Sequence, residues 1–169
     1  IKLYGEILVD EYPSQPGSSN PDKRGHLVGF KVPVYNNYFI NLEYSNVFAG
    51  VYEHRIEENE YTFNGEYIGH SFGADLEEYD LKIGYEDQHK SIGFIYRNIK
   101  KGENNRNVRS NVGINGVLLK EIKEIIESYN IYYLIQNDNN QYGIEIKKEN
   151  FLFTSKSTFN IKLSCQYLF

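Results

Sequence analysis

The sequence contains no tryptophan and no methionine, a single cysteine and only four prolines. One cysteine cannot form an internal disulfide or a cysteine metal cluster, so neither is expected to stabilise the fold. Cys165 falls on the apolar side of a strand-like stretch, where a small apolar side chain fits and no chemistry is expected. No apolar run approaches the ~20 residues that a membrane-spanning helix needs, which excludes that class of protein.

Positive charge is also scarce. Lys and Arg number 18 against 23 Asp and Glu, for a net charge of −5. Nucleic-acid binding favours a basic surface, so no nucleic-acid partner is expected. The one basic cluster, Lys100, Lys101, Arg106 and Arg109, is interrupted by Glu103 and several asparagines and indicates a solvated loop.

Aromatic residues are abundant by contrast, with 16 Tyr and 10 Phe. Tyrosine has an apolar ring and a polar hydroxyl, which suits the interface between a membrane and water, and membrane β-barrels carry girdles of such residues. The mean hydropathy is negative. That value is compatible with a barrel, because polar residues facing the lumen lower the average.

Apolar and polar residues alternate over the C-terminal stretch 158–167, and Phe169 continues the apolar phase. The apolar positions are Phe159, Ile161, Leu163, Cys165, Tyr167 and Phe169. A period of two predicts a strand with one apolar face. The closing aromatic residue resembles the C-terminal signature of bacterial outer-membrane barrels. This resemblance implies that Tyr167 and Phe169 form an insertion signal for the barrel-insertion machinery.

Eight strand-like stretches are predicted along the chain, an even number, as bacterial barrels require. They cover about residues 2–10, 25–35, 38–52, 78–86, 90–98, 122–137, 141–153 and 158–169. The apolar positions of 38–44 and of 79–85 begin and end with tyrosine. That spacing suits two interfacial girdles that flank a hydrocarbon band.

The connections alternate in length. The connections on one side of the sheet are short and rich in Asn and Asp: 36–37, 87–89 and 138–140. Those on the other side are long, at 11–24, 53–77 and 99–121, except for the last one, near 154–157, which is short. Short periplasmic turns opposite long external loops favour a barrel over a soluble all-β sandwich. We therefore expect one antiparallel transmembrane β-barrel domain over residues 1–169, or the C-terminal part of a larger outer-membrane barrel.

One segment also fits a helix. Leu118, Leu119, Ile122, Ile125 and Ile126 recur at helical spacing, separated by charged residues. A short helix near 117–127 is as well supported as a strand, and it would lie in or over an external loop.

No constellation of residues predicts catalysis. The histidines form no zinc-protease pair, and a cation site built from His54, His70 and nearby acids is a minor alternative. Ser71 lacks the Gly-x-Ser-x-Gly elbow of hydrolases, although a neighbouring histidine keeps an outer-membrane hydrolase open as an alternative. The expectation is a protein that is not an enzyme and has no cofactor and no metal.

The most distinctive residues lie between 43 and 75. They are Glu43-Tyr44-Ser45-Asn46-Val47, Tyr52-Glu53-His54-Arg55, Tyr61-Thr62 and Ile68-Gly69-His70-Ser71-Phe72-Gly73-Ala74-Asp75. Together with Tyr4-Gly5-Glu6, this pattern resembles the Wzi family of outer-membrane barrels, which act in capsule assembly. The resemblance implies a lectin-like protein that holds capsular polysaccharide, or another surface glycan, at the bacterial outer membrane. Family members are larger barrels, so the chain would be the C-terminal part of one.

The candidate polysaccharide-binding residues lie in or beside the 53–77 connection: Tyr52, His54, Arg55, Tyr61, His70 and Asp75. Aromatic rings can stack on sugar faces, and charged or polar side chains can hydrogen-bond to hydroxyls. Structural roles are open for each, such as a girdle position for Tyr52 or a surface ion pair for Arg55. A porin-like channel or an adhesion barrel without glycan specificity is the alternative function.

The first residue, Ile1, opens directly into strand-like sequence, with no initiator methionine and no signal segment before it. We therefore expect a mature or truncated chain of an exported protein. As an outer-membrane barrel, it would have outer-membrane lipid among its partners.

Overall fold

A computed structural model describes residues 1–11, 23–48, 51, 62–63, 66–67, 73–102, 122–137 and 140–167. Regular structure in these ranges consists of strands alone. The strands are β1 (Lys2–Glu11), β2 (Lys23–Pro33), β3 (Tyr38–Val47), β4 (Thr62–Phe63), β5 (Glu66–Tyr67), β6 (Leu76–Glu86), β7 (Lys90–Gly102), β8 (Ile122–Asn137), β9 (Asn140–Phe151) and β10 (Lys156–Tyr167). The predicted all-β class is confirmed.

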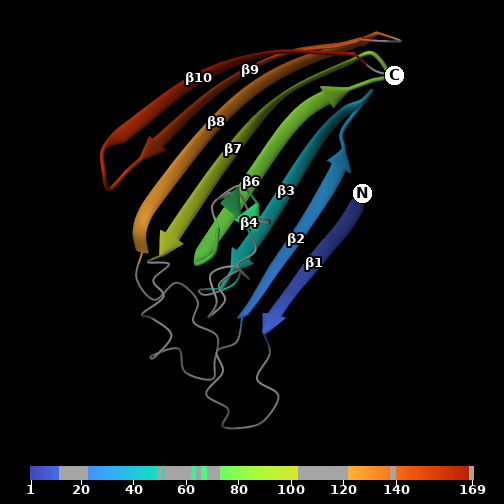
Figure 1. Ribbon diagram of the computed structural model, residues 1–169. Coiled ribbons are helices and arrows are strands. Elements are labelled where there is room, and N and C mark those ends of the chain that lie inside the picture. The colour runs from blue at the N-terminus through green and yellow to red at the C-terminus, as the bar shows by residue number, and fades with distance from the viewer. Residues whose placement is uncertain are drawn as a thin grey trace, which may run out of the picture.

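Eight strands form a single curved sheet in the order β1-β2-β3-β6-β7-β8-β9-β10 (Figure 1). Every neighbouring pair is antiparallel. These are the eight stretches that the alternation predicts, with ends shifted by a few residues. The two short strands β4 and β5 pair with each other in a separate sheet, within a connection for which the sequence predicted no strand.

The predicted helix near 117–127 is wrong over residues 122–127, which are strand; residues 117–121 lie outside the described ranges. The cause is pairing on both edges of β8. Ile126 lies opposite Ile99 of β7 and opposite Phe151 of β9. Its side chain is buried, at 3% exposed. Two ladders of backbone hydrogen bonds together with this burial outweigh a local helical spacing of apolar residues.

The short turns form as predicted at one end of the sheet. Asn36 and Asn37 have positive φ angles of 39° and 70°, a conformation that asparagine tolerates. In the 87–89 turn, Asp87 Oδ1 accepts hydrogen bonds from the backbone N–H groups of His89 (2.8 Å) and Lys90 (2.9 Å). The third predicted turn, 138–140, lies mostly outside the described residues. β1 begins and β10 ends at this same end (Figure 1).

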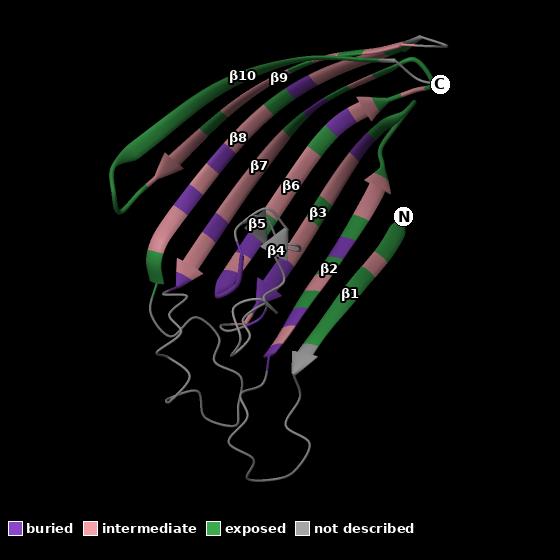
Figure 2. Cartoon of the chain, viewed as in Figure 1, coloured by how far each residue is buried: buried purple, intermediate pink, exposed green. Residues whose placement is uncertain are grey.

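The two faces of the sheet have an inverted distribution of polarity. Apolar side chains on the convex face are exposed, among them Leu3 (76%), Ile7 (79%) and Leu163 (75%). Many polar side chains lie on the concave face, and some of them are buried, including Glu78 (8%) and Ser128 (2%). Figure 2 shows buried positions interspersed with intermediate ones along the central strands, with exposed positions dominating β1 and β10. A soluble protein would place these faces the other way round.

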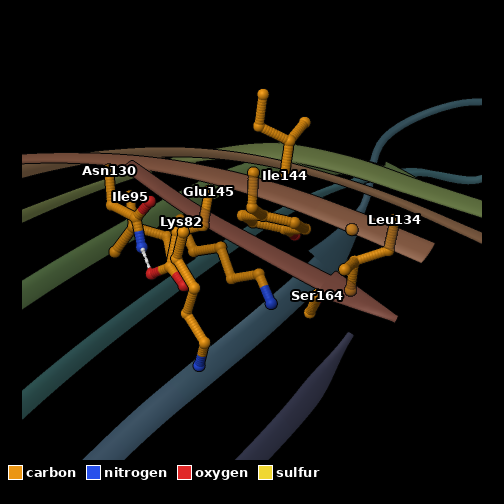
Figure 3. Close-up of a pocket in the computed structure, with 10 residues that line it drawn as sticks. Lys82, Ile95, Asn130, Leu134, Ile144, Glu145 and Ser164 are labelled. Carbon is orange, nitrogen blue, oxygen red and sulfur yellow. Dashed lines mark hydrogen bonds between the residues drawn. The ribbon is translucent and has the colours of Figure 1, made fainter. Parts of the chain in front are cut away.

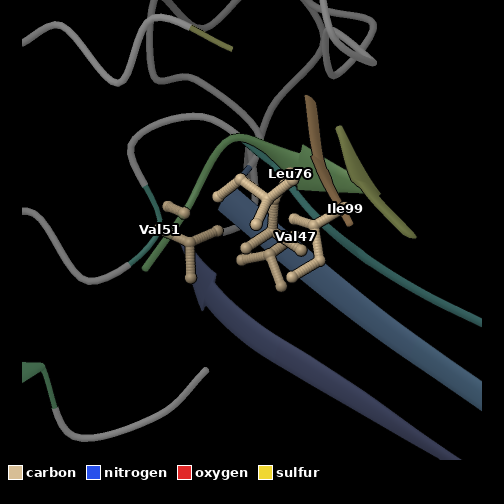
Figure 4. Close-up of a cluster of buried hydrophobic side chains, with 6 residues drawn as sticks. Val47, Val51, Leu76 and Ile99 are labelled. Atoms are coloured by element: carbon tan, nitrogen blue, oxygen red, sulfur yellow. The ribbon is translucent and has the colours of Figure 1, made fainter. Parts of the chain in front are cut away.

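A small apolar core lies at the end of the sheet opposite the short turns. Val47, Val51, Ala74, Leu76, Ile99 and Ile126 pack together there, with Phe48 and Phe151 against them (Figure 4). Val47 lies opposite Leu76, and Ile99 opposite Ile126, so the cluster crosses four neighbouring strands on the concave face. It fixes the points where β3 ends and β6 begins, on either side of the long connection that carries most of the candidate site.

The sheet is an open arc. β1 and β10 are its two edges, and among the described strands only neighbours in the sheet order contact each other. The sequence left open whether eight strands close into a ring, and in this structure they do not.

Candidate functional site

Tyrosines on the convex face form two rows. The row nearer the long connections contains Tyr44, Tyr79, Tyr96 and Tyr129, and the row nearer the short turns contains Tyr38, Tyr85 and Tyr133. Ring centroids are 5.0 Å apart for Tyr44–Tyr79, 5.3 Å for Tyr96–Tyr129 and 5.0 Å for Tyr38–Tyr85. The rings therefore line up across strands and do not scatter over the surface.

Carboxylates lie on the outer side of each row of tyrosines and accept hydrogen bonds from it. Tyr44 donates a hydrogen bond to Glu77 Oε1 (2.9 Å), and Tyr129 donates to Glu127 Oε2 (3.1 Å). In the other row, Tyr85 donates to Asp87 Oδ2 (2.6 Å). Six residues separate the rows along β3 and β6, which is about 20 Å of extended strand. The hydroxyls thus point out of an apolar band towards charge at both of its borders.

The concave face carries a polar network near the long connections. Arg97 Nε lies 2.6 Å from Asp80 Oδ2 and 3.5 Å from Glu78 Oε1. The Tyr4 hydroxyl hydrogen-bonds to Asn41 Oδ1 (2.9 Å) and to Glu43. This part of the wall is rich in carboxylates, since Glu43, Asp80 and Glu149 lie on one row of the register around Arg97.

A second, basic zone lies on the same face closer to the short turns. Lys31 Nζ is 4.1 Å from the centre of the Phe39 ring, and Lys82 Nζ lies 5.5 Å from Phe39 and 5.1 Å from Tyr132. Lys162 lies further along the wall, on β10, directly opposite Glu145 of β9. The concave wall therefore changes from mainly acidic to mainly basic along the strand direction.

Most of the candidate binding residues lie outside the described ranges: Tyr52, His54, Arg55, Tyr61 and His70. For the predicted insertion signal, the backbone of Tyr167 ends β10, and Phe169 lies outside the described residues. No proximity among the predicted ligand-binding residues can therefore be derived, and their roles stay predictions.

Asp75 is the exception. Its φ angle is 57°, it is 6% exposed, and its carbonyl accepts a hydrogen bond from the Gly102 N–H (2.8 Å). Its carboxylate packs so closely over Gly102 that a Cβ there would lie 2.2 Å from Oδ2. Asp75 thus joins the start of β6 to the end of β7, which is a structural position with little surface left for a ligand.

Apart from Tyr4 and Glu43, which belong to the family-like motif, the sequence singled out none of the residues of the polar network or of the basic zone on the concave wall. Their only signal was that they are the polar half of the same alternation whose apolar half predicted the strands. Among the described residues no cluster of His, Cys, Asp and Glu is arranged to hold a metal ion.

No family model, no curated protein and no solved structure matches this chain. No helix long and apolar enough to cross a membrane occurs in the part of the chain that the structure describes.

Proposed function

We propose that this chain is part of a bacterial outer-membrane β-barrel that binds capsular or other surface polysaccharide through its external loops during capsule assembly. The observation that carries the membrane part is the exposed apolar band on the convex face between two rows of tyrosine. Exposed apolar area of this extent needs a covering, and hydrocarbon is a suitable one.

Three features support lipid as that covering. Apolar side chains such as Leu42, Ile83 and Ile131 fill the band between the tyrosine rows. The tyrosine hydroxyls reach carboxylates at its borders, as amphipathic side chains do where hydrocarbon meets water. The opposite face is polar, which suits an aqueous lumen.

The glycan part of the proposal rests on the motif resemblance between residues 43 and 75 and on the long connections gathered at one end of the sheet. Those connections would face outwards, with the short turns in the periplasm. The protein would have no enzymatic activity, and its partners would be the glycan, outer-membrane lipid and the insertion machinery.

Location is tested by fractionating cells that express the full-length gene product and comparing its gel migration before and after boiling. A folded barrel in the outer-membrane fraction should shift on boiling. A protein in the soluble fraction without this shift would overturn both the membrane and the capsule assignments.

Glycan binding is tested with Arg55→Ala, Tyr61→Ala and His70→Ala in the purified full-length protein. Binding to glycan purified from the producing cells should fall, and cells carrying the variants should retain less capsule. His89→Ala is the matched control, because His89 is exposed in a short turn at the opposite end. Unchanged binding in all three loop variants would refute the site assignment.

A porin-like channel is the second candidate, and the charged concave wall favours it. Conductance in planar bilayers without glycan affinity would support this function. An outer-membrane hydrolase would require ester turnover that Ser71→Ala abolishes.

A further inference from the structure

A hollow of about 340 Å³ lies on the concave wall, away from the loops. Its polar lining comes from strands β6, β8, β9 and β10: Lys82, Asn130, Glu145, Lys162 and Ser164, with the Tyr132 ring beside them. Figure 3 shows Lys82 beside the hydrogen-bonded Asn130 and Glu145, whereas Ile144 projects from the opposite, convex face. The hollow therefore opens towards the interior of the arc.

Its two ammonium groups have no carboxylate partner among the described residues. Lys82 Nζ lies over the aromatic rings of Phe39 and Tyr132. Lys162 faces Glu145 in the strand register. The Glu145 carboxylate is held at 2.7 Å by the Asn130 side-chain amide, and no ion pair joins it to Lys162. The nearest acid on the Lys82 strand, Asp80, is engaged by Arg97 at 2.6 Å.

Two ammonium groups against one carboxylate leave the hollow with a net positive charge, in a protein whose overall charge is −5. A concave surface with an excess of one sign of charge concentrates ligands of the opposite sign. The amide of Asn130 and the hydroxyl of Ser164 supply hydrogen-bonding groups of the kind that recognise sugar hydroxyls.

We propose that this hollow binds a carboxylate-bearing sugar unit of an acidic polysaccharide, with Lys82 and Lys162 as the groups that bind the carboxylate. The inference rests on the proposed function, which it deepens in two respects: the glycan is acidic, and the protein contacts it on the inner wall as well as at the loops. The carboxylate-rich zone around Glu43 and Glu149 lies nearer the loops and would repel an anionic sugar unit. The basic hollow is therefore the favoured binding position for that unit on the concave wall.

The test measures binding of a galacturonic-acid trisaccharide and of a neutral galactose trisaccharide to the full-length protein in detergent. The double variant Lys82→Gln/Lys162→Gln should weaken acidic trisaccharide binding by about tenfold or more, because hydrogen bonds from two charged groups to the carboxylate are lost. Neutral trisaccharide binding should change little. Added salt should weaken acidic binding more in the unmodified protein than in the double variant.

Lys148→Gln is the matched control. It removes one ammonium from β9 on the convex face, where Lys148 lies opposite Tyr129 and Phe159. It should leave both affinities unchanged, and the gel shift on boiling verifies that each variant is folded.

The inference is overturned if the unmodified protein does not bind the acidic trisaccharide, or if the double variant binds it as tightly as Lys148→Gln does. If the loop variants still reduce binding of cell-derived glycan in that case, the proposed function survives. Absence of the full-length protein from the outer membrane would overturn both.

Discussion

Single glycines decide how aromatic rings lie on the concave wall. Tyr4 lies over Gly29, Phe39 over Gly84 and Tyr132 over Gly93, each so close that an added Cβ would lie within 3.0 Å of a ring atom or hydroxyl. The missing side chain lets the ring lie directly against the neighbouring strand. Tyr4 reaches Asn41 and Glu43 on β3 in this way, across β2.

Gly84→Ala should destabilise the protein by about 1–3 kcal/mol, the usual range for overpacking. The new Cβ would lie 2.8 Å from the Ile92 carbonyl oxygen and 3.0 Å from the Phe39 ring, so backbone and ring would both have to move. Urea unfolding of the full-length protein in lipid measures the change. Gly25→Ala is the control, because its nearest neighbour would be 3.5 Å away. Equal stability of the two variants would contradict the packing described.

Asp87 gives a pH-dependent prediction at the short turns. The hydrogen bond from Tyr85, together with the backbone N–H groups of His89 and Lys90, lowers the pKa of Asp87 from 3.8 to about 2. A lowered pKa stabilises the folded state above the unfolded pKa, and this contribution is lost as the pH falls towards 2. Asp87→Asn should therefore unfold at lower urea concentration than the unmodified protein at pH 7.

The difference between Asp87→Asn and the unmodified protein should shrink between pH 4 and pH 2, the interval set by these two pKa values. Glu86→Gln removes only an exposed 3.6 Å ion pair with Lys31 and should have little effect at either pH. A constant difference across this interval would mean that the Asp87 carboxylate does not titrate with folding.

At the scale of strands, the sequence predicted most of the sheet because a strand with one apolar face shows period-two alternation. Residues 79–85 and 158–167 show it clearly, and both lie in strands. The prediction was ambiguous around Ile122 and Ile126, where helical and strand spacings coincide. Pairing with β7 and β9 decides that case, and a single sequence does not reveal pairing.

The site was less predictable than the strands. Asp75 was selected for its place in a motif, whereas its buried position over Gly102 depends on where β6 and β7 meet. Lys82 and Lys162 lie eighty residues apart in the sequence and line one hollow only because β6 to β10 curve around it. Convergence of this kind depends on sheet curvature, which local residue patterns do not specify.

Two adjacent residues of β10 test which medium covers each face. Ile161 lies on the convex face opposite Ile146, and Asn160 lies on the concave face opposite Lys147. If lipid covers the convex face, Ile161→Arg should destabilise the folded protein by about 2–4 kcal/mol, the cost of arginine near the bilayer midplane. Asn160→Arg should cost far less, because its side chain would face water.

Urea unfolding in lipid vesicles compares these two variants. Ile161 is 60% exposed, so in a soluble protein both substitutions would be nearly neutral. Two small and equal effects would therefore contradict a membrane location independently of any fractionation result.

At the scale of the whole molecule, the sheet has two edge strands, β1 and β10, each with one side that pairs with no other described strand. Strand edges expose unpaired N–H and C=O groups, which cannot remain unpaired in hydrocarbon. β1 and β10 end an arc in which neither strand contacts the other. In a membrane these edges must pair with further strands, or with each other after a change in curvature.

Disulfide formation with the native Cys165 distinguishes these two arrangements in the full-length protein. Tyr142→Cys should cross-link to Cys165 on oxidation, because the two positions lie directly opposite each other on β9 and β10. Opposed residues in antiparallel strands have Cα atoms roughly 4.5–5.5 Å apart, within the range a disulfide spans. This variant establishes whether the exposed Cys165 thiol is reactive in the folded protein.

Cysteines placed singly at Leu3, Ile7 and Val9, on the same convex face of β1, should give no intramolecular cross-link to Cys165 if the arc is part of a larger barrel. Mobility on a non-reducing gel reports each product. A disulfide from any of these positions would mean that β1 and β10 pair and that eight strands close into a ring. Closure would narrow the lumen enough for side chains to fill it, leaving no open wall at which Lys82 and Lys162 could receive a polysaccharide.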